Sequence, residues 1–406
     1  MIVVDPEQTS SKQQHLVPKR AVGTGSDPPS FDDHPPPFTP YAASYFTSGQ
    51  GDVVSHDPHL NEDSEALYRF LLSQASAPPR LVLHCRGSHS EVHTRLVPEH
   101  RAGRIETTTE TYTERITDFD FKIDVSQHIM DTPTHWSFGD SVPAYRGRMF
   151  HEVDVGEEKR KAKRAEITAA KAWDKERRGK GYPPWIGNHY AWREDQPHIM
   201  HGSSVLKSSW TLRQWADDYC TSKKYLKEFV YDKVVYGWNF DAIKAATCSV
   251  VGSTQYTGDV EIDFQTSNAR IFVRSENNLS RALSNRWVKF VLIVTLVYPF
   301  LWLFKRFHSR GGGKWGICGG AYALKRIERV DPQITLAETK YPDSPFGIAG
   351  NTFRERPSGL SEPDFPGLQS RVVGLREGTW FRQWEGTIRM AREERPAAPV
   401  LLLDGY

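Results

Sequence analysis

The sequence has few cysteines and no signature of a known reaction, and these absences narrow the class of protein. Its 406 residues include four cysteines, which are far apart and form no C-x-x-C pair. A disulfide framework is therefore not expected, and the cysteine usage fits a reducing compartment. There is no G-x-S-x-G elbow and no complete phosphate-binding loop, so the sequence predicts no catalytic residue and no cofactor.

Apolar residues are also scarce. They make up 38% of the chain, and the mean hydropathy is -0.56, which is low for a multi-pass membrane protein. We therefore expect at most one or two segments in lipid. The formal net charge of +2 gives no reason to expect nucleic-acid binding. The first twenty residues lack the apolar core of a signal peptide, so we expect any membrane targeting to be internal.

Composition and periodicity predict an α+β fold with disordered tails. The regions before and after a charged segment at 154–181 each contain period-2 runs that are typical of strands. The interpretation divides the chain into a disordered Pro-rich tail at 1–64, a β-rich region at 65–153, a charged basic helix at 154–181, an α+β region at 182–280, a transmembrane helix at 287–307 and a mostly irregular tail at 308–406.

Within the β-rich region, a helix at 64–74 precedes a strand, a turn at Gly87 and a second strand or short helix. A half-buried strand follows, because apolar residues alternate with charged ones at Ile116, Phe119, Phe121, Ile123 and Val125.

The α+β region reads as helix, helix and hairpin. Thr211 and Gln214 form a T-x-x-Q capping box before the first helix. Helical spacing through Tyr225, Leu226, Phe229 and Val230 predicts a further helix.

The charged segment 157–180 holds ten Lys or Arg against five Asp or Glu. Its apolar stripe is poor, so a largely solvated helix is expected. An exposed basic helix suits anionic lipid or a protein partner, and both remain open as partners.

The stretch WVKFVLIVTLVYPFLWLFKRF, residues 287–307, differs from the rest of the chain. Among the fifteen residues from Phe290 to Phe304, only Thr295 is polar. An amphipathic helix of a soluble domain would keep a polar face, so the stretch predicts a membrane segment. Eighteen helical residues reach about 27 Å, which is short but adequate for one span. The residues expected in the span are Trp287, Phe290, Leu292, Val294, Leu296, Pro299, Leu301, Trp302 and Phe304.

Two features leave the mode of insertion and the orientation open. Pro299 removes a backbone donor and should kink a helix, so a re-entrant hairpin in one leaflet is the alternative to a single span. Four basic residues flank each side of the stretch, so the positive-inside rule predicts no orientation. They are Arg274, Arg281, Arg286 and Lys289 before the stretch, and Lys305, Arg306, Arg310 and Lys314 after it.

Two segments invite a chemical interpretation. His84, Cys85, His89 and His93 are a ligand-rich cluster suited to zinc by residue type, but their spacing matches no metal-site pattern. We therefore predict surface histidines and no metal site, with a membrane-tethered metal-dependent enzyme as the alternative function. The Gly-rich segment 311–324 lacks the phosphate-loop spacing and predicts a flexible loop next to the membrane.

Several segments together resemble a family of uncharacterised fungal single-span membrane proteins, some of which are labelled ABC-transporter-like. They are TDFDFKIDV, YRGRMFHEV, YGWNFDAIKAA and YTGDVEIDF, followed by one apolar stretch, and they lie within residues 65–325. The resemblance implies a bilayer location and supplies no catalytic residues. The transporter label has no motif support here, because a Walker A loop and a multi-pass bundle are both missing from the sequence.

These observations predict a single-pass, membrane-anchored protein that binds or scaffolds at a membrane surface. Its main partner would be the lipid bilayer. The endoplasmic reticulum or another endomembrane fits the missing signal peptide, and an enzymatic activity is not expected.

Overall fold

We describe the protein from a computed structural model of the whole chain. The structure describes residues 42–101, 104–155, 158–187, 205–330, 369–393 and 400–403. These belong to one compact unit, residues 42–406, of mixed α and β structure, so the predicted α+β class is confirmed. The hairpin predicted in the second region is wrong, because its two strands, residues 259–267 and 270–274, pair with other strands in two separate sheets. Residues 1–41 of the predicted Pro-rich tail lie outside the described residues.

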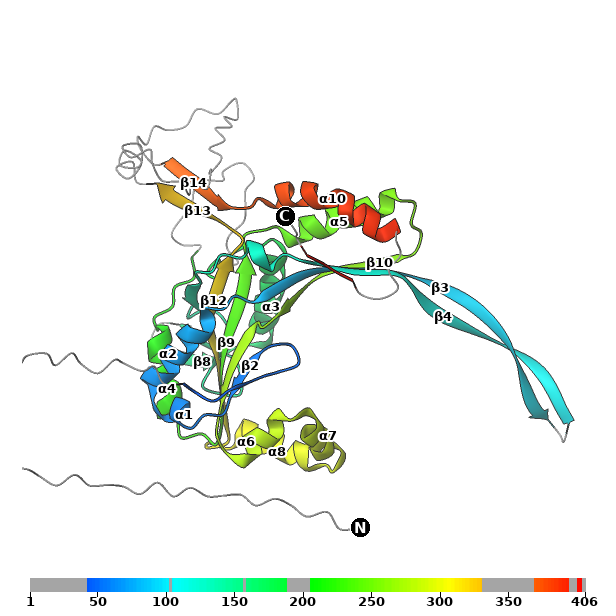
Figure 1. Cartoon of the computed structure of the whole chain (residues 1–406). Helices are drawn as coiled ribbons and strands as arrows, with labels where there is room; N and C mark the ends of the chain where they lie inside the picture. Colours follow the sequence, from blue (N-terminus) through cyan, green and yellow to red (C-terminus); the bar gives the residue numbers. More distant parts are fainter. Residues whose placement is uncertain are drawn as a thin grey trace, which may run out of the picture. The chain divides into compact units, whose positions relative to one another are not determined.

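A seven-stranded central sheet forms the framework. Its strand order is β1-β2-β11-β9-β12-β5, and β6 also pairs with β12. Figure 1 labels β2, β9 and β12 of this sheet. The two central strands, β9 and β12, run parallel, whereas β11 is antiparallel to β9 and β5 is antiparallel to β12. The strands are β1 (Phe46–Thr47), β2 (Val53–Ser55), β5 (Thr134–Ser137), β6 (Tyr145–Arg146), β9 (Leu226–Tyr236), β11 (Arg270–Arg274) and β12 (Gly312–Ala323).

The second helix predicted around Tyr225, Leu226, Phe229 and Val230 is wrong. Residues 226–236 form β9, which is buried on both faces. A short apolar run that is covered on both sides has no period that separates helix from strand. The Val and Tyr residues that follow favour the strand.

The Gly-rich segment that predicted a flexible loop is the central strand β12. Almost all of its residues are buried. A Cβ atom on Gly319 would lie 2.0 Å from the carbonyl oxygen of Asp232 in β9, and one on Gly320 would lie 2.9 Å from the Tyr231 hydroxyl oxygen. The glycines therefore permit close approach of two backbones, and they do not indicate flexibility.

A second sheet has four strands in the order β10-β3-β4-β15. Its strands are β3 (Arg80–Arg101), β4 (Arg104–Asp124), β10 (Asp259–Ser267) and β15 (Val400–Leu403). β10 pairs with residues 80–88 only, so the outer part of the β3–β4 hairpin continues as a two-stranded ribbon (Figure 1).

The turn predicted at Gly87 is wrong, because β3 runs straight through it. The register shifts between Gly87 and Ser88, which leaves Asp118 as the extra residue of a β-bulge in β4. A Cβ atom on Gly87 would lie 2.1 Å from the Phe119 ring. The glycine therefore makes room for a core aromatic side chain within a continuous strand.

Helices cover the sheets in two groups. The helices α1 (His59–Glu62), α2 (Ser64–Ala75) and α4 (Leu212–Thr221) share a core with the central sheet. The helices α5 (Phe240–Ser253) and α10 (Glu377–Glu393) share a second core with the four-stranded sheet. Because β1, β2 and α1 are ordered elements, the predicted tail does not extend through residues 42–64.

The charged segment is only partly helical. β7 (Glu152–Val155) pairs with β8 (Glu158–Lys161), and the helix α3 spans Arg164–Gly179. The prediction of a helix from residue 154 is therefore wrong at its start. The Glu166 carboxylate accepts hydrogen bonds from the Lys163 backbone N–H at 2.7 Å and from Arg160 at 2.6 Å, which closes the first turn at Arg164.

The predicted irregular C-terminal tail also contains ordered elements. Besides β12, α10 and β15, β13 (Lys325–Val330) pairs with β14 (Gln369–Gly374). The remaining described elements are η1 (Ser126–His128), α6 (Asn278–Ser284), α7 (Arg286–Val294) and α8 (Val297–Phe307).

Candidate functional site

The apolar stretch forms two short helices in place of one long one. No single helix among the described residues is long and apolar enough to cross a membrane, but α7 and α8 pass that test together, with a bend of 102° between them. The bend lies at Leu296, which has φ of 58° in the left-handed region. The predicted single helix over 287–307 is therefore not what the structure contains.

Pro299 explains why α8 starts where it does. It is the third residue of α8, and the first backbone N–H groups of a helix have no partner within the helix. A proline costs nothing there, whereas it would remove a hydrogen bond from the interior of a continuous helix. The sequence correctly indicates a disturbance at Pro299, and the structure moves the break three residues upstream to Leu296.

The α7–α8 pair is the most exposed apolar segment of the described chain. Twelve of the twenty-one exposed large apolar side chains belong to residues 287–307. Among the side chains predicted in the span, six are exposed and three are half-buried. The exposed ones are Trp287, Phe290, Val294, Leu296, Pro299 and Trp302, and the half-buried ones are Leu292, Leu301 and Phe304.

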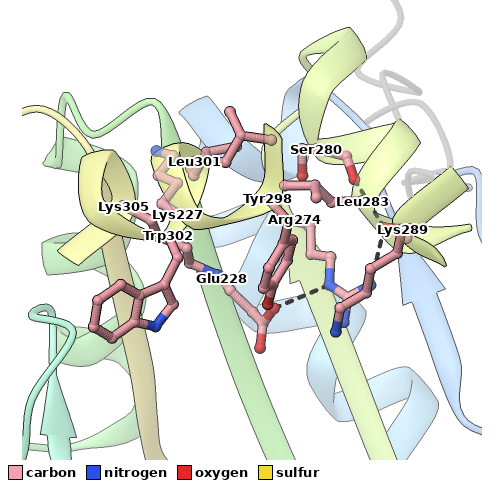
Figure 2. A pocket seen from close by; sticks show the side chains of 12 residues that line it. Lys227, Glu228, Arg274, Ser280, Leu283, Lys289, Tyr298, Leu301, Trp302 and Lys305 are labelled. Carbon is pink, nitrogen blue, oxygen red and sulfur yellow. Dashed lines mark hydrogen bonds and ion pairs between the residues drawn. The ribbon is translucent and has the colours of Figure 1, made fainter. Parts of the chain in front are cut away.

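A cavity of about 160 Å³ lies between this helix pair and the ends of β9 and β11. Four of its lining side chains are cationic and one is a carboxylate (Figure 2). We call it the basic cavity; it is lined by Leu226, Lys227, Glu228, Arg274, Ser280, Leu283, Ser284, Lys289, Tyr298, Leu301, Trp302 and Lys305.

Two of the four cations have fixed partners. Arg274 pairs with Glu228 at 3.1 Å and donates a hydrogen bond of 2.9 Å to the Ser284 hydroxyl oxygen. The Lys227 ammonium donates to backbone carbonyl oxygens, with Asn61 at 2.9 Å and Tyr219 at 3.0 Å among them. Burial lowers the pKa of Lys227, since desolvation disfavours the charged form.

The other two cations have no carboxylate partner among the described residues. Lys289 lies over the Tyr298 ring, with its nitrogen 5.5 Å from the ring centroid, and this contact leaves its positive charge in place. Lys305 is half-buried. Figure 2 shows Lys289 and Lys305 on opposite sides of the cavity, with Arg274 and Glu228 between them. The cavity therefore has an excess of positive charge.

Sequence reasoning missed this cavity. Arg274, Lys289 and Lys305 are noted in the sequence only as flanking charges of an apolar stretch. In a straight helix Lys289 and Lys305 would be about 24 Å apart along the axis, and only the bend between α7 and α8 brings both to one cavity. No local signal in the sequence predicts that bend's angle.

The histidine cluster does not converge on one point. Cys85 is fully buried in the second core, whereas His84 faces Asp120 at 2.8 Å, because neighbouring side chains of a strand point to opposite faces. His89 lies 2.7 Å from an Asp118 oxygen, and His93 pairs with Glu91 at 3.4 Å. In the described part of the chain, no three or more His, Cys, Asp or Glu residues gather as a metal site requires.

Much of the charge on α3 is paired locally. Arg178 pairs with Asp174 at 2.9 Å and Lys180 pairs with Glu176 at 2.6 Å. Both are i,i+4 pairs of the kind that support solvated helices. Contact of residues 157–180 with anionic lipid or a protein partner stays a prediction.

Comparisons with protein-family models, with curated proteins and with solved structures found no match to this chain. The resemblance to fungal membrane proteins therefore stays a prediction.

Proposed function

We propose that the protein attaches to a membrane by inserting the α7–α8 pair into one leaflet, and that its α+β part binds or scaffolds partners at that surface. The observation that carries the proposal is the concentration of exposed apolar side chains on α7 and α8. Monomeric soluble proteins rarely expose so large a contiguous apolar surface, and such surfaces mark interaction sites.

The geometry favours insertion into one leaflet over a single span. α7 has 9 residues and α8 has 11, so the helices are roughly 14 Å and 17 Å long. Each is about half of the hydrocarbon thickness of roughly 30 Å. Because the chain bends by 102° between them, the pair does not cross the hydrocarbon as one rod and fits within the depth of one leaflet.

The chemistry of the pair suits the interface between lipid and water. Trp287 is exposed at the end of α7 that lies away from the bend, and tryptophan is enriched where the hydrocarbon meets the headgroups. Lys289 and Lys305 lie on the side of the basic cavity, where they keep their charge out of the hydrocarbon. Burying one exposed Phe or Leu in lipid contributes roughly 1.5–3 kcal/mol, so several together provide stable attachment.

Co-sedimentation of the full chain with phosphatidylcholine vesicles tests the proposal. The double variant Val294→Asp/Phe300→Asp should stay in the supernatant, because carboxylates in hydrocarbon are costly. The control is Val92→Asp/Leu96→Asp on the β3–β4 ribbon. Its side chains are 68% and 71% exposed, against 64% and 71% for the test pair. Equal sedimentation of both variants with the wild-type chain would overturn the proposal.

Protease protection of terminal tags on sealed vesicles separates the two modes of insertion. Insertion into one leaflet leaves both tags on the same side, so both are digested from outside. A single span protects one of the two tags. Protection of one tag would still support membrane attachment, but it would contradict insertion into one leaflet.

A further inference from the structure

We infer that the basic cavity binds the phosphate group of an anionic lipid, with Lys289 and Lys305 as the cations that contact it and Arg274 between them. This inference rests on the proposed insertion of α7–α8, which would bring lipid headgroups to the mouth of the cavity. It names the class of lipid that the attachment site selects.

The excess positive charge of the cavity favours the binding of an anion. Four cationic side chains face one carboxylate, and that carboxylate, Glu228, is already paired with Arg274. Lys227 is held by carbonyl oxygens, so it adds positive potential without needing a counter-ion. Lys289 and Lys305 are left with no ion-pair partner in the described chain. Lys305 is half-buried, and a half-buried cation without a partner costs free energy that a bound anion recovers.

The cavity has room for a phosphate group. Its volume is about 160 Å³, roughly ten times the ~15 Å³ that one buried water needs, so a phosphate with several waters fits. A phosphomonoester carries a charge of about −1.5 to −2 at neutral pH, which matches the two lysines that lack a carboxylate partner. The charge therefore favours a phosphomonoester headgroup.

The position of the cavity favours a phosphate that is attached to a lipid. Its walls include Trp302 and Leu301 of α8, and it therefore continues directly into the apolar surface of the helix pair. A phosphate seated between Lys289 and Lys305 would have its acyl chains beside the exposed side chains of α7 and α8. A free phosphate would use only the polar half of this arrangement.

Vesicle binding by the full chain provides the test. The vesicles contain phosphatidylcholine alone, or phosphatidylcholine with the same molar fraction of phosphatidic acid or of phosphatidylserine. We expect the wild-type chain to prefer phosphatidic acid. The variant Lys289→Gln/Lys305→Gln should bind phosphatidic acid vesicles about 25-fold more weakly, since each lysine at an anionic surface contributes roughly fivefold, and should lose the preference over phosphatidylserine.

A matched control removes the same charge elsewhere. Lys171→Gln/Lys175→Gln changes two exposed lysines of α3 and should leave the preference for phosphatidic acid intact. If the α3 variant loses the preference and the cavity variant retains it, the inference is wrong and the basic helix is the lipid contact. Thermal unfolding of both variants checks that each is folded.

Soluble glycerol 3-phosphate separates this inference from the proposed function and from free phosphate. Its binding by isothermal titration needs no vesicle, so it reports on the cavity even if α7–α8 does not insert. Binding that is lost in Lys289→Gln/Lys305→Gln supports the cavity as the phosphate site, and competition by inorganic phosphate at equal strength would assign it to free phosphate. Absence of binding together with no lipid preference would overturn the inference, while sedimentation with neutral vesicles would still support insertion.

Discussion

The hydroxyl group of Thr295 donates a hydrogen bond of 2.9 Å to the carbonyl oxygen of Val291. The same carbonyl accepts the backbone N–H of Thr295 at 2.9 Å, so the last turn of α7 is closed by its own side chain. Such back-bonding by threonine is typical of places where helices bend. The only polar side chain between Phe290 and Phe304 therefore ends the first helix, and Leu296 then turns the chain.

The left-handed conformation of Leu296 can be tested by comparing the stabilities of two variants at this position. A residue with a Cβ atom costs about 1 kcal/mol there and glycine does not, so Leu296→Gly should be more stable than Leu296→Ala by about that amount. Amides of α8 should exchange about fivefold more slowly in the glycine variant, measured by hydrogen exchange. A continuous helix would reverse the order, because glycine destabilises a helix interior by about 1 kcal/mol relative to alanine.

Local patterns in the sequence predict several elements of the structure correctly. The capping box of Thr211 and Gln214 is present as expected, and the helix predicted at 64–74 corresponds to α2. The alternation of Phe119, Phe121 and Ile123 is confirmed, since all three are buried in the second core. Each of these signals depends on neighbours within a few residues, which the sequence displays directly.

The elements that sequence analysis missed depend on distant neighbours. β12 reads as a loop by composition, and only the close approach of β9 explains its glycines. β9 reads as a helix, and only the elements that cover both of its faces make it a strand. The basic cavity combines side chains of β9, β11, α6, α7 and α8, so no single segment of the sequence contains its pattern.

The close contact between β9 and β12 predicts a strong effect of one methyl group. A Cβ atom on Gly319 would lie 2.0 Å from a backbone oxygen of Asp232, which cannot move without disrupting the sheet. Gly319→Ala should lower the free energy of urea-induced unfolding by roughly 3 kcal/mol. The control is Gly386→Ala in α10, where the added Cβ meets nothing within 4 Å and should stabilise by up to about 1 kcal/mol. Equal stability of the two variants would contradict the assignment of β12.

The four cysteines should differ in reactivity. Cys248 is exposed, whereas Cys85 and Cys318 are buried. Burial raises the pKa of Cys85 to about 12 and of Cys220 to about 11, and the thiolate is the species that reacts. Iodoacetamide at neutral pH should therefore label Cys248 in the folded protein and reach Cys85 and Cys318 only after denaturation, as mass spectrometry of peptides would show. Labelling of Cys85 as fast as Cys248 would refute the inward orientation of residue 85 in β3.

His56 couples the stability of this region to pH. One ring nitrogen of His56 lies 2.9 Å from the Ser275 carbonyl oxygen, and the other lies 2.9 Å from the Ser284 hydroxyl oxygen. Because a carbonyl oxygen only accepts, the nitrogen facing Ser275 carries the proton. Burial, the largest cause, lowers the pKa of His56 from 6.5, and the nearby Arg274 and Arg281 charges act in the same direction.

The sign of the pH effect follows from this lowered pKa. Well above pH 6.5, His56 is neutral in the folded and the unfolded chain, so it contributes no pH dependence. As the pH falls through 6.5 the unfolded chain binds a proton first, and the free energy of unfolding decreases until the folded-state pKa is reached. His56→Asn keeps an N–H donor for Ser275 and removes the titration. The variant should therefore lose less stability than the wild-type chain between about pH 7.5 and pH 5.5, measured by urea unfolding. Parallel pH profiles for the two chains would show that His56 is equally basic in both states.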